Sequence, residues 1–141
     1  MELFDRSFSE LTALQLYDIV RLRVDVFVVE QQCPYGDLDG RDTERGTRHI
    51  WQGDAKGVVS YLRVLDEGDV RRIGRVVTRP DARGGGLSVR LLDHVVEATD
   101  GPWVLGAQAH LADWYRRLGF VTDGEPYVED GIPHVPMRRE P

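Results

Sequence analysis

The chain has 141 residues, of which 41% are hydrophobic and 30% charged, and its formal net charge is −6. This length and composition predict a single soluble domain over residues 1–141, and no apolar run of about 18 residues is present to cross a membrane. The acidic balance argues against general nucleic-acid binding, which draws its affinity from cationic contacts to phosphates. Cys33 is the only cysteine, and the N-terminus lacks the features of a secretory signal, so we expect a cytoplasmic protein.

The first clear element is a helix that begins after Thr12. Thr12 and Gln15 have the spacing of a capping box, in which each side chain accepts a hydrogen bond from the backbone of the other residue. Apolar residues then recur at helical spacing as far as Phe27, and the pattern fades over residues 28–30. Residues 31–46 are polar and rich in turn formers, which predicts a long connection of the kind that is usually functional or mobile.

Three strands are predicted after this loop, followed by a helix, a strand, a helix and two closing strands. The turn at residues 66–69 makes the strands on either side of it an antiparallel hairpin. Gly119 follows a short helical pattern, as expected of the residue that ends a helix. The predicted strands lie at 49–51, 57–64, 70–78 and 103–107, with closing strands at 120–121 and 132–137, and the later helices lie at 89–98 and 111–118.

The order of these elements, with a first strand ahead of the first helix, predicts an α/β fold. A strand–helix–strand unit in the middle implies one parallel pair of strands with antiparallel strands around it. We therefore expect a single mixed β-sheet flanked by helices on both faces. A Rossmann domain and a Walker loop are excluded, because the only glycine run lacks the G-x-G-x-x-G spacing and no Gly-Lys-Ser/Thr follows it.

A glycine run, Arg83-Gly84-Gly85-Gly86-Leu87-Ser88, separates a predicted strand from a predicted helix. Glycines let a ligand approach the backbone, and the N–H groups of a helix's first turn are unpaired and carry a partial positive charge. These features predict a cradle for a phosphate or pyrophosphate. Arginines nearby form a basic patch that fits a small anionic ligand, although two of them alone also fit a solvated strand edge. The patch consists of Arg71, Arg72, Arg75, Arg79 and Arg83.

Residues 77–88 resemble the acetyl-CoA-binding signature of the GNAT superfamily of N-acetyltransferases. The core of that signature, Arg/Gln-x-x-Gly-x-Gly/Ala, falls on Arg83, Gly86 and Ser88. A second signature of the superfamily is an amide-bearing strand end followed by a short helix that ends aromatic-Tyr-x-x-x-Gly-Phe. Gln108 and residues 114–120 are similar to it. Two signatures at the right separation make a stronger match than the glycine run alone.

The N-terminal third narrows the resemblance to the ElaA-like branch of the superfamily. Residues 22–40, 107–111 and 129–134 are similar to that branch, so the resemblance extends over nearly the whole chain. It departs in three places, none of which removes a group that the chemistry needs. The departures are Ser88 for a glycine or alanine, Trp114 for a common phenylalanine, and Gln108 for a common asparagine.

This resemblance implies an acetyl-CoA-dependent N-acetyltransferase that transfers an acetyl group directly to a primary amine of a small molecule or peptide. Acetyl-CoA is the implied donor, and no metal is expected because no set of His, Cys and Asp residues has metal-ligand spacing. Backbone groups of one strand would hold the pantetheine arm and the thioester, and amides of the glycine run would hold the pyrophosphate. The residues implied in donor binding are Val76, Val77, Thr78, Arg83, Gly84, Gly85, Gly86, Leu87, Ser88 and Gln108.

Tyr115 is the implied general acid, because a phenol can share its proton with the departing thiolate of CoA. The general base is left open, and water could carry the proton instead. The candidates, which are also expected to contact the acceptor, are Glu30, His49 and His134, with Asp37 and Asp39 behind them. The acidic loop over residues 37–44 either attracts a cationic amine or is simply solvated.

Two other functions fit part of the sequence. A non-catalytic module that senses acyl-CoA would not require Tyr115, and thiol release with a broad set of amines would distinguish it from an enzyme. An acetyltransferase acting on charged tRNA is disfavoured by the acidic balance and by the lack of a broad basic surface. The sequence identifies neither the acceptor nor the oligomeric state, and a homodimer would use the closing strands.

Overall fold

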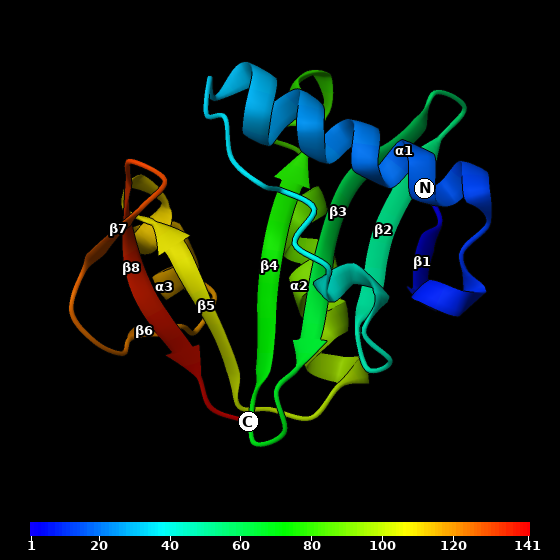
Figure 1. The fold of residues 1–141 in the computed structure, drawn as a ribbon. Coiled ribbons are helices and arrows are strands. Elements are labelled where there is room, and N and C mark those ends of the chain that lie inside the picture. The colour runs from blue at the N-terminus through cyan, green and yellow to red at the C-terminus, as the bar shows by residue number, and fades with distance from the viewer.

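The computed structural model describes all residues from Met1 to Pro141 (Figure 1). One mixed sheet runs in the order β1-β2-β3-β4-β5-β8-β6, and β7 also pairs with β8. The strands are β1 (Leu3–Ser7), β2 (Arg48–Asp54), β3 (Gly57–Asp66), β4 (Arg71–Thr78), β5 (Trp103–Gln108), β6 (Val121–Thr122), β7 (Tyr127–Glu129) and β8 (Ile132–Arg139). The α-helices are α1 (Ala13–Arg23), α2 (Leu87–Ala98) and α3 (Ala112–Arg117).

The helices cover both faces of the sheet, as predicted. Figure 1 shows α1 in front of the sheet and α2 behind it, and both helices pack on β3 and β4. Successive strand residues point to opposite faces, so Ile50 of β2 belongs to the core beneath α2 and α3 while Trp51 belongs to the core beneath α1. The predicted α/β fold with a mixed sheet is confirmed. No helix combines the length and the apolar character needed to cross a membrane.

The N-terminal helix begins where the sequence predicts. Thr12 and Gln15 form the capping box, with each side chain accepting from the backbone N–H of the other at 3.0 and 3.1 Å. The helical run ends at Glu30, where the sequence pattern fades, but its last part is a π-helical segment, η2 (Val24–Glu30), which was not predicted. The long connection that follows contains one short 3-10 turn, η3 (Arg41–Thr43).

The centre of the sheet contains the parallel pair that the strand–helix–strand pattern predicts. β4 and β5 pair only through Arg71 and Arg72 opposite Trp103 and Val104, and beyond these residues the two strands separate. β4 also carries one extra residue relative to β3, since Gly74 lies opposite Arg63 but Val77 lies opposite Tyr61. Such a bulge bends the strand and re-aims its groups. Because β4 and β5 separate beyond Arg72, the edge of β4 that faces β5 is unpaired from there on.

The C-terminal region forms a second small group of antiparallel strands. β6 pairs with β8, which confirms the predicted closing strands. Gly119 has a φ of +94° and ends α3, as expected of a helix-terminating glycine. β7 was not predicted; it has three residues, all of them exposed, and pairs with the first part of β8.

Candidate active site

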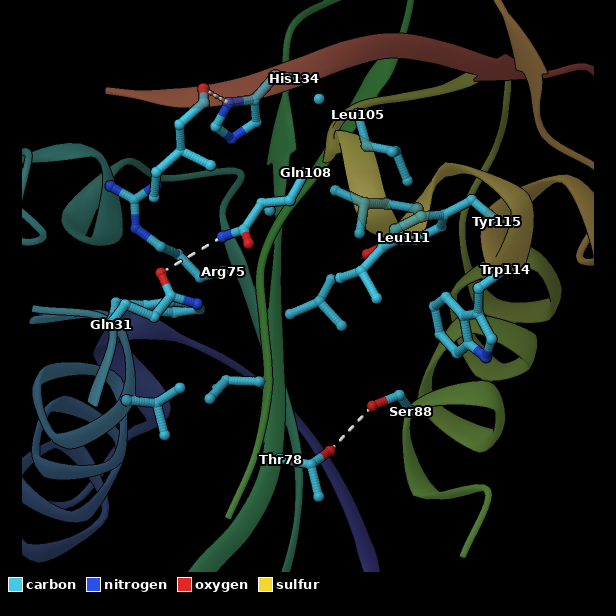
Figure 2. A pocket seen from close by; sticks show the side chains of 18 of the residues that line it. Gln31, Arg75, Thr78, Ser88, Leu105, Gln108, Leu111, Trp114, Tyr115 and His134 are labelled. Carbon is cyan, nitrogen blue, oxygen red and sulfur yellow. Dashed lines mark hydrogen bonds between the residues drawn. The ribbon is translucent and has the colours of Figure 1, made fainter. Parts of the chain in front are cut away.

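The separation of β4 and β5 opens a cleft of about 1290 Å³. Its walls come from β4, the glycine run, β5, α3, the loop after η2 and the β7–β8 hairpin (Figure 2). All the residues implied in donor binding line it except Gly85, and Tyr115, Glu30 and His134 line it as well. The structure therefore brings together most of the predicted site residues from separate parts of the chain.

The glycine run presents free backbone donors to this cleft. Gly84 and Gly86 have φ values of +84° and +80°, a left-handed conformation that favours glycine. Gly86 is the N-cap of α2, and its carbonyl accepts from the N–H of Arg90 at 3.1 Å. The N–H groups of Gly84, Gly85 and Gly86 donate to no acceptor in the protein. Together with the first turn of α2, they can hold an anion such as a phosphate.

Two hydroxyl groups tie the glycine run to the end of β4. The Oγ1 of Thr78 lies 2.9 Å from the Oγ of Ser88 (Figure 2). It also lies 3.1 Å from the Oγ of Ser60. The serine that departs from the usual signature therefore links α2 to the strand beneath it. Ser88 is engaged with Thr78, and the backbone amides of the glycine run are free donors at this end of the cleft.

The arginine cluster is not the free basic patch that the sequence predicts. Four of its five arginines form ion pairs with carboxylates. Arg79 pairs with two of them, Asp54 and Asp81. These pairs neutralise most of the local positive charge. The pairs are Arg72–Glu67 at 3.0 Å, Arg75–Asp37 at 2.9 Å, Arg79–Asp54 at 2.8 Å and Arg83–Glu30 at 2.8 Å.

Tyr115 lies on α3 with its ring packed edge-on against Trp114 and Phe120, at centroid distances of 4.8 and 5.9 Å. The residue is 6% exposed, yet it lines the cleft, and its hydroxyl has no hydrogen-bond partner in the protein. Burial raises the pKa of this phenol above its ordinary value. Tyr115 therefore carries its proton at neutral pH and is placed to give it to a group in the cleft.

The three candidate bases differ sharply in their surroundings. Glu30 accepts a hydrogen bond from each terminal nitrogen of Arg83, and this contact lowers the pKa of its carboxyl group. His49 is fully buried outside the cleft, with its ring nitrogens 2.7 Å from the Tyr61 hydroxyl and 2.9 Å from the Asp42 carbonyl. Burial lowers the pKa of His49. The expected contact between His49 and the acceptor does not fit this position, whereas His134 lines the cleft.

A buried ionic network anchors the acidic loop, and the sequence did not predict it. Arg23 of α1 lies 2.9 Å from Asp37 and 2.6 Å from Asp42, with 1% of its side chain exposed. Asp39 pairs with Arg63 of β3 at 2.5 Å. Asp37 and Asp42 are buried and Asp39 is partly exposed, and all three carboxylates are paired with arginines, which reduces their attraction for an amine. A signal was present, because Arg23 follows Ile19 by four residues and so shares the apolar face of α1.

No group of three or more His, Cys, Asp or Glu residues lies so that it could hold a metal ion. Cys33 is a free, buried thiol at the edge of the loop, with its Sγ 3.5 Å from the carbonyl oxygen of Asp130. The residues that line the cleft include tyrosines, histidines, amide side chains and charged side chains besides the glycine run. This set suits binding of an anionic cofactor and proton transfer.

Comparison with known proteins identifies the family. Residues 16–141 match the acetyltransferase (GNAT) domain family. The chain is 50% identical to a UPF0039 protein of Mycobacterium tuberculosis, over 93% of this chain and 88% of that protein. It is 43% identical to the protein ElaA of Escherichia coli K12, over 96% and 94% of the two chains.

Solved structures agree with these matches. An acyl-CoA N-acyltransferase from Pseudomonas aeruginosa superposes with a TM-score of 0.93 at 40% identity, over 99% of both chains. The E. coli ElaA structure gives 0.91 at 41% identity, over 99% of this chain and 100% of that one. The resemblance that the two signatures and the N-terminal third predict is confirmed, and the chain belongs to the GNAT acetyltransferase family, with ElaA among its homologues.

Proposed function

We propose that this protein is an acetyl-CoA-dependent N-acetyltransferase that transfers an acetyl group directly to a primary amine of a small molecule or peptide. Membership of the GNAT family supports an acyl-CoA donor. The observation that carries the proposal is that the unpartnered hydroxyl of Tyr115 and the free amides of the glycine run open into one cleft. The single cysteine supports a reducing compartment, the cytoplasm, as the place of this activity.

The donor fits the cleft as an extended molecule. Its pyrophosphate would accept hydrogen bonds from the amides of Gly84, Gly86 and the first turn of α2, where the helix dipole also favours negative charge. The pantetheine arm would follow the unpaired edge of β4 past Val77 towards the bulge. This path brings the thioester between the separated strands, where Tyr115 lines the wall.

Acetyl transfer to an amine needs a neutral nucleophile, stabilisation of the carbonyl oxygen and a proton for the departing thiolate. The unpaired N–H groups on the edge of β4 would stabilise the oxygen as it gains charge. Tyr115 would protonate the sulfur, because burial keeps the phenol protonated until the thiolate forms. Cys33 is buried at the loop and is not needed as a carrier of the acetyl group when transfer is direct.

Thiol release from acetyl-CoA tests this function. The purified protein is incubated with acetyl-CoA and, in turn, spermidine, tyramine, glycinamide and a lysine-containing peptide, and free CoA thiol is measured. We expect at least one amine to raise the rate above release in water, and Tyr115→Phe to remove most of that increase. Tight CoA binding with no amine-dependent release would instead identify a non-catalytic acyl-CoA-binding module.

A further inference from the structure

His134 lies in the cleft, where residues of β5, β7 and β8 surround it. It lies on β8, opposite Gln108 of β5 and Tyr127 of β7. Its ring stacks on the ring of Tyr127, with centroids 5.4 Å apart and planes inclined by 18°. Figure 2 shows the imidazole projecting from β8 into the cleft towards Gln108. The ring is therefore held on one side and open on the other.

A single hydrogen bond fixes the tautomer of this histidine. The Nδ1 of His134 lies 2.7 Å from the carbonyl oxygen of Ile132. A carbonyl can only accept, so Nδ1 carries the hydrogen and donates it, and in the neutral ring Nε2 keeps its lone pair. No protein group bonds to Nε2, and Figure 2 shows it on the side of the ring that faces the cleft. The imidazole is arranged as a proton acceptor.

Gly106 makes the stacking partner of His134 possible. A Cβ at Gly106 would lie 2.0 Å from the hydroxyl oxygen of Tyr127 and 4.0 Å from the Cδ2 of His134. Because this strand position has no side chain, the Tyr127 ring can extend from β7 across β8 to β5. A glycine inside a strand often marks such a close approach. Gly106 and Tyr127, which also line the cleft, therefore set the orientation of the imidazole.

Tyr115 and His134 reach the cleft from opposite faces of the sheet. Leu105 and Ala107 of β5 belong to the core that contains Tyr115, beneath α2 and α3. Gly106 lies between them and faces the other way, towards His134. A proton donor on one face and a proton acceptor on the other can serve two different atoms of one reaction, the leaving sulfur and the attacking nitrogen.

The geometry points to His134 as the general base that takes the proton from the acceptor amine. This assignment rests on the proposed acetyltransferase function. Glu30 lies beside Arg83 at the end of the cleft proposed for the donor's phosphates, and His49 is buried away from the cleft, so neither of these candidates lies beside the proposed thioester position. His110 also lines the cleft, but it is exposed and no hydrogen bond fixes its tautomer. His134 alone combines a fixed tautomer with an open Nε2.

Each proton in this reaction has a destination. The acceptor enters as an ammonium ion, and His134 Nε2 takes one proton and passes it to water. The amine nitrogen then bonds to the thioester carbon, and the C=O electron pair moves to oxygen. When that pair returns, the C–S bond breaks and Tyr115 gives its proton to the sulfur. The nitrogen loses its second proton to His134, which passes it to water, and Tyr115 regains a proton from water. The products are the amide, CoA thiol and one proton.

The groups around His134 influence how an acceptor ammonium ion approaches it and how the proposed proton transfer depends on pH. Tyr127 of β7 stacks on it, and Glu129 and Asp130 lie at the turn of the same hairpin and line the cleft. β5 presents the neutral Gln108, and Arg75 of β4, across the cleft, is already paired with carboxylates of the loop. Two carboxylates therefore lie on the side of the cleft where an ammonium ion would approach His134.

His134→Gln tests the proposal, with His110→Gln as the matched control in the same cleft. The assay is thiol release from acetyl-CoA with whichever amine of the four-amine panel wild type uses fastest. We expect His134→Gln to lower kcat by about 100-fold or more, the usual range for a general base, while CoA affinity and Tm stay near wild type. His110→Gln is expected to keep wild-type kcat. A kcat for His134→Gln within threefold of wild type overturns the proposal.

The pH profile separates a base from a merely structural residue. Wild-type kcat/KM should contain an ionisation that His134→Gln lacks, and the variant should keep rising with pH as the amine loses its proton unaided. A variant profile parallel to that of wild type at every pH contradicts the assignment. If no amine raises thiol release by wild type, the proposed function itself fails, which is distinct from an active wild type with an unaffected His134→Gln.

Discussion

Arg83 in the glycine run donates two hydrogen bonds to the carboxylate of Glu30 at the end of η2, at 2.8 and 2.9 Å. The pair joins the two sides of the cleft at the end where the donor's phosphates are proposed to lie. Both side chains are more than 40% exposed, and exposed ion pairs of this kind contribute little to stability. A phosphate entering the cleft can therefore take the place of the Glu30 carboxylate at small cost.

This relationship predicts opposite effects of two substitutions on CoA affinity. Arg83→Ala should weaken binding by about 10-fold or more, because a hydrogen bond to a charged group contributes about 1.5–3 kcal/mol. Glu30→Gln should strengthen it by up to about threefold at low salt, since the competing carboxylate is lost, and screening should remove the gain at high salt. Titration calorimetry at two salt concentrations measures both effects. Wild-type affinity in Arg83→Ala would rule out this phosphate contact.

Tyr115→Phe should separate catalysis from stability. The hydroxyl has no partner in the protein, so its removal should leave Tm and CoA affinity unchanged while kcat falls by about 100-fold. Thermal unfolding, calorimetry and thiol release on the same preparation make the three measurements. A large drop in Tm would mean that the hydroxyl has a structural role, and an unchanged kcat would remove Tyr115 from the chemistry.

Gly86 and Gly85 form a matched pair for the conformation of the glycine run. Gly86 has a φ of +80°, whereas Gly85 lies outside the left-handed region and a Cβ there would meet only the carbonyl oxygen of Ala82, at 3.9 Å. Gly86→Ala should cost about 1–2 kcal/mol, which lowers Tm by roughly 3–8 °C in a chain of this size. Gly85→Ala should leave Tm unchanged or slightly raised. Equal Tm values for the two variants would contradict the loop geometry.

The buried network predicts that Arg23 matters far more than its exposed neighbour on the same helix. Arg23→Met removes the arginine that Asp37 and Asp42 share and leaves them with Arg75 and Arg63 alone. Breaking a buried pair costs about 3–5 kcal/mol, and these remaining arginines place the expected loss towards the lower end. Arg21→Met is the control, because Arg21 is 67% exposed and its contact with Asp25 is 3.9 Å long. Urea unfolding should show the loss for Arg23→Met alone. Similar stabilities for both variants would mean that the network contributes little.

Most of the fold could be predicted from local patterns in the sequence. The capping box at Thr12 and Gln15, the hairpin on either side of the 66–69 turn, and Gly119 at the end of α3 each depend on residues close together in the chain, and all three are present. β7 was missed because it is short, exposed and without an apolar pattern. The bulge was missed because Arg75 adopts a φ of +54°, which a non-glycine residue rarely does.

The site residues that belong to the family motifs could be predicted from the sequence. The contacts between segments that are distant in the chain could not. The glycine run and Tyr115 lie in the cleft as the motifs imply. The pairing of Arg83 with Glu30 joins residues 53 positions apart, and no local pattern indicates it. The choice between His49 and His134 likewise depends on burial and on the hydrogen bond to Ile132, which only the folded chain provides.

A crystal structure of the protein with CoA tests the central claim most directly. The account predicts that the pyrophosphate oxygens accept hydrogen bonds from the amides of Gly84 and Gly86, and that the CoA sulfur lies between β4 and β5 within hydrogen-bond reach of the Tyr115 hydroxyl. CoA bound on another surface, or bound in the cleft with its sulfur pointing away from Tyr115, would contradict the account.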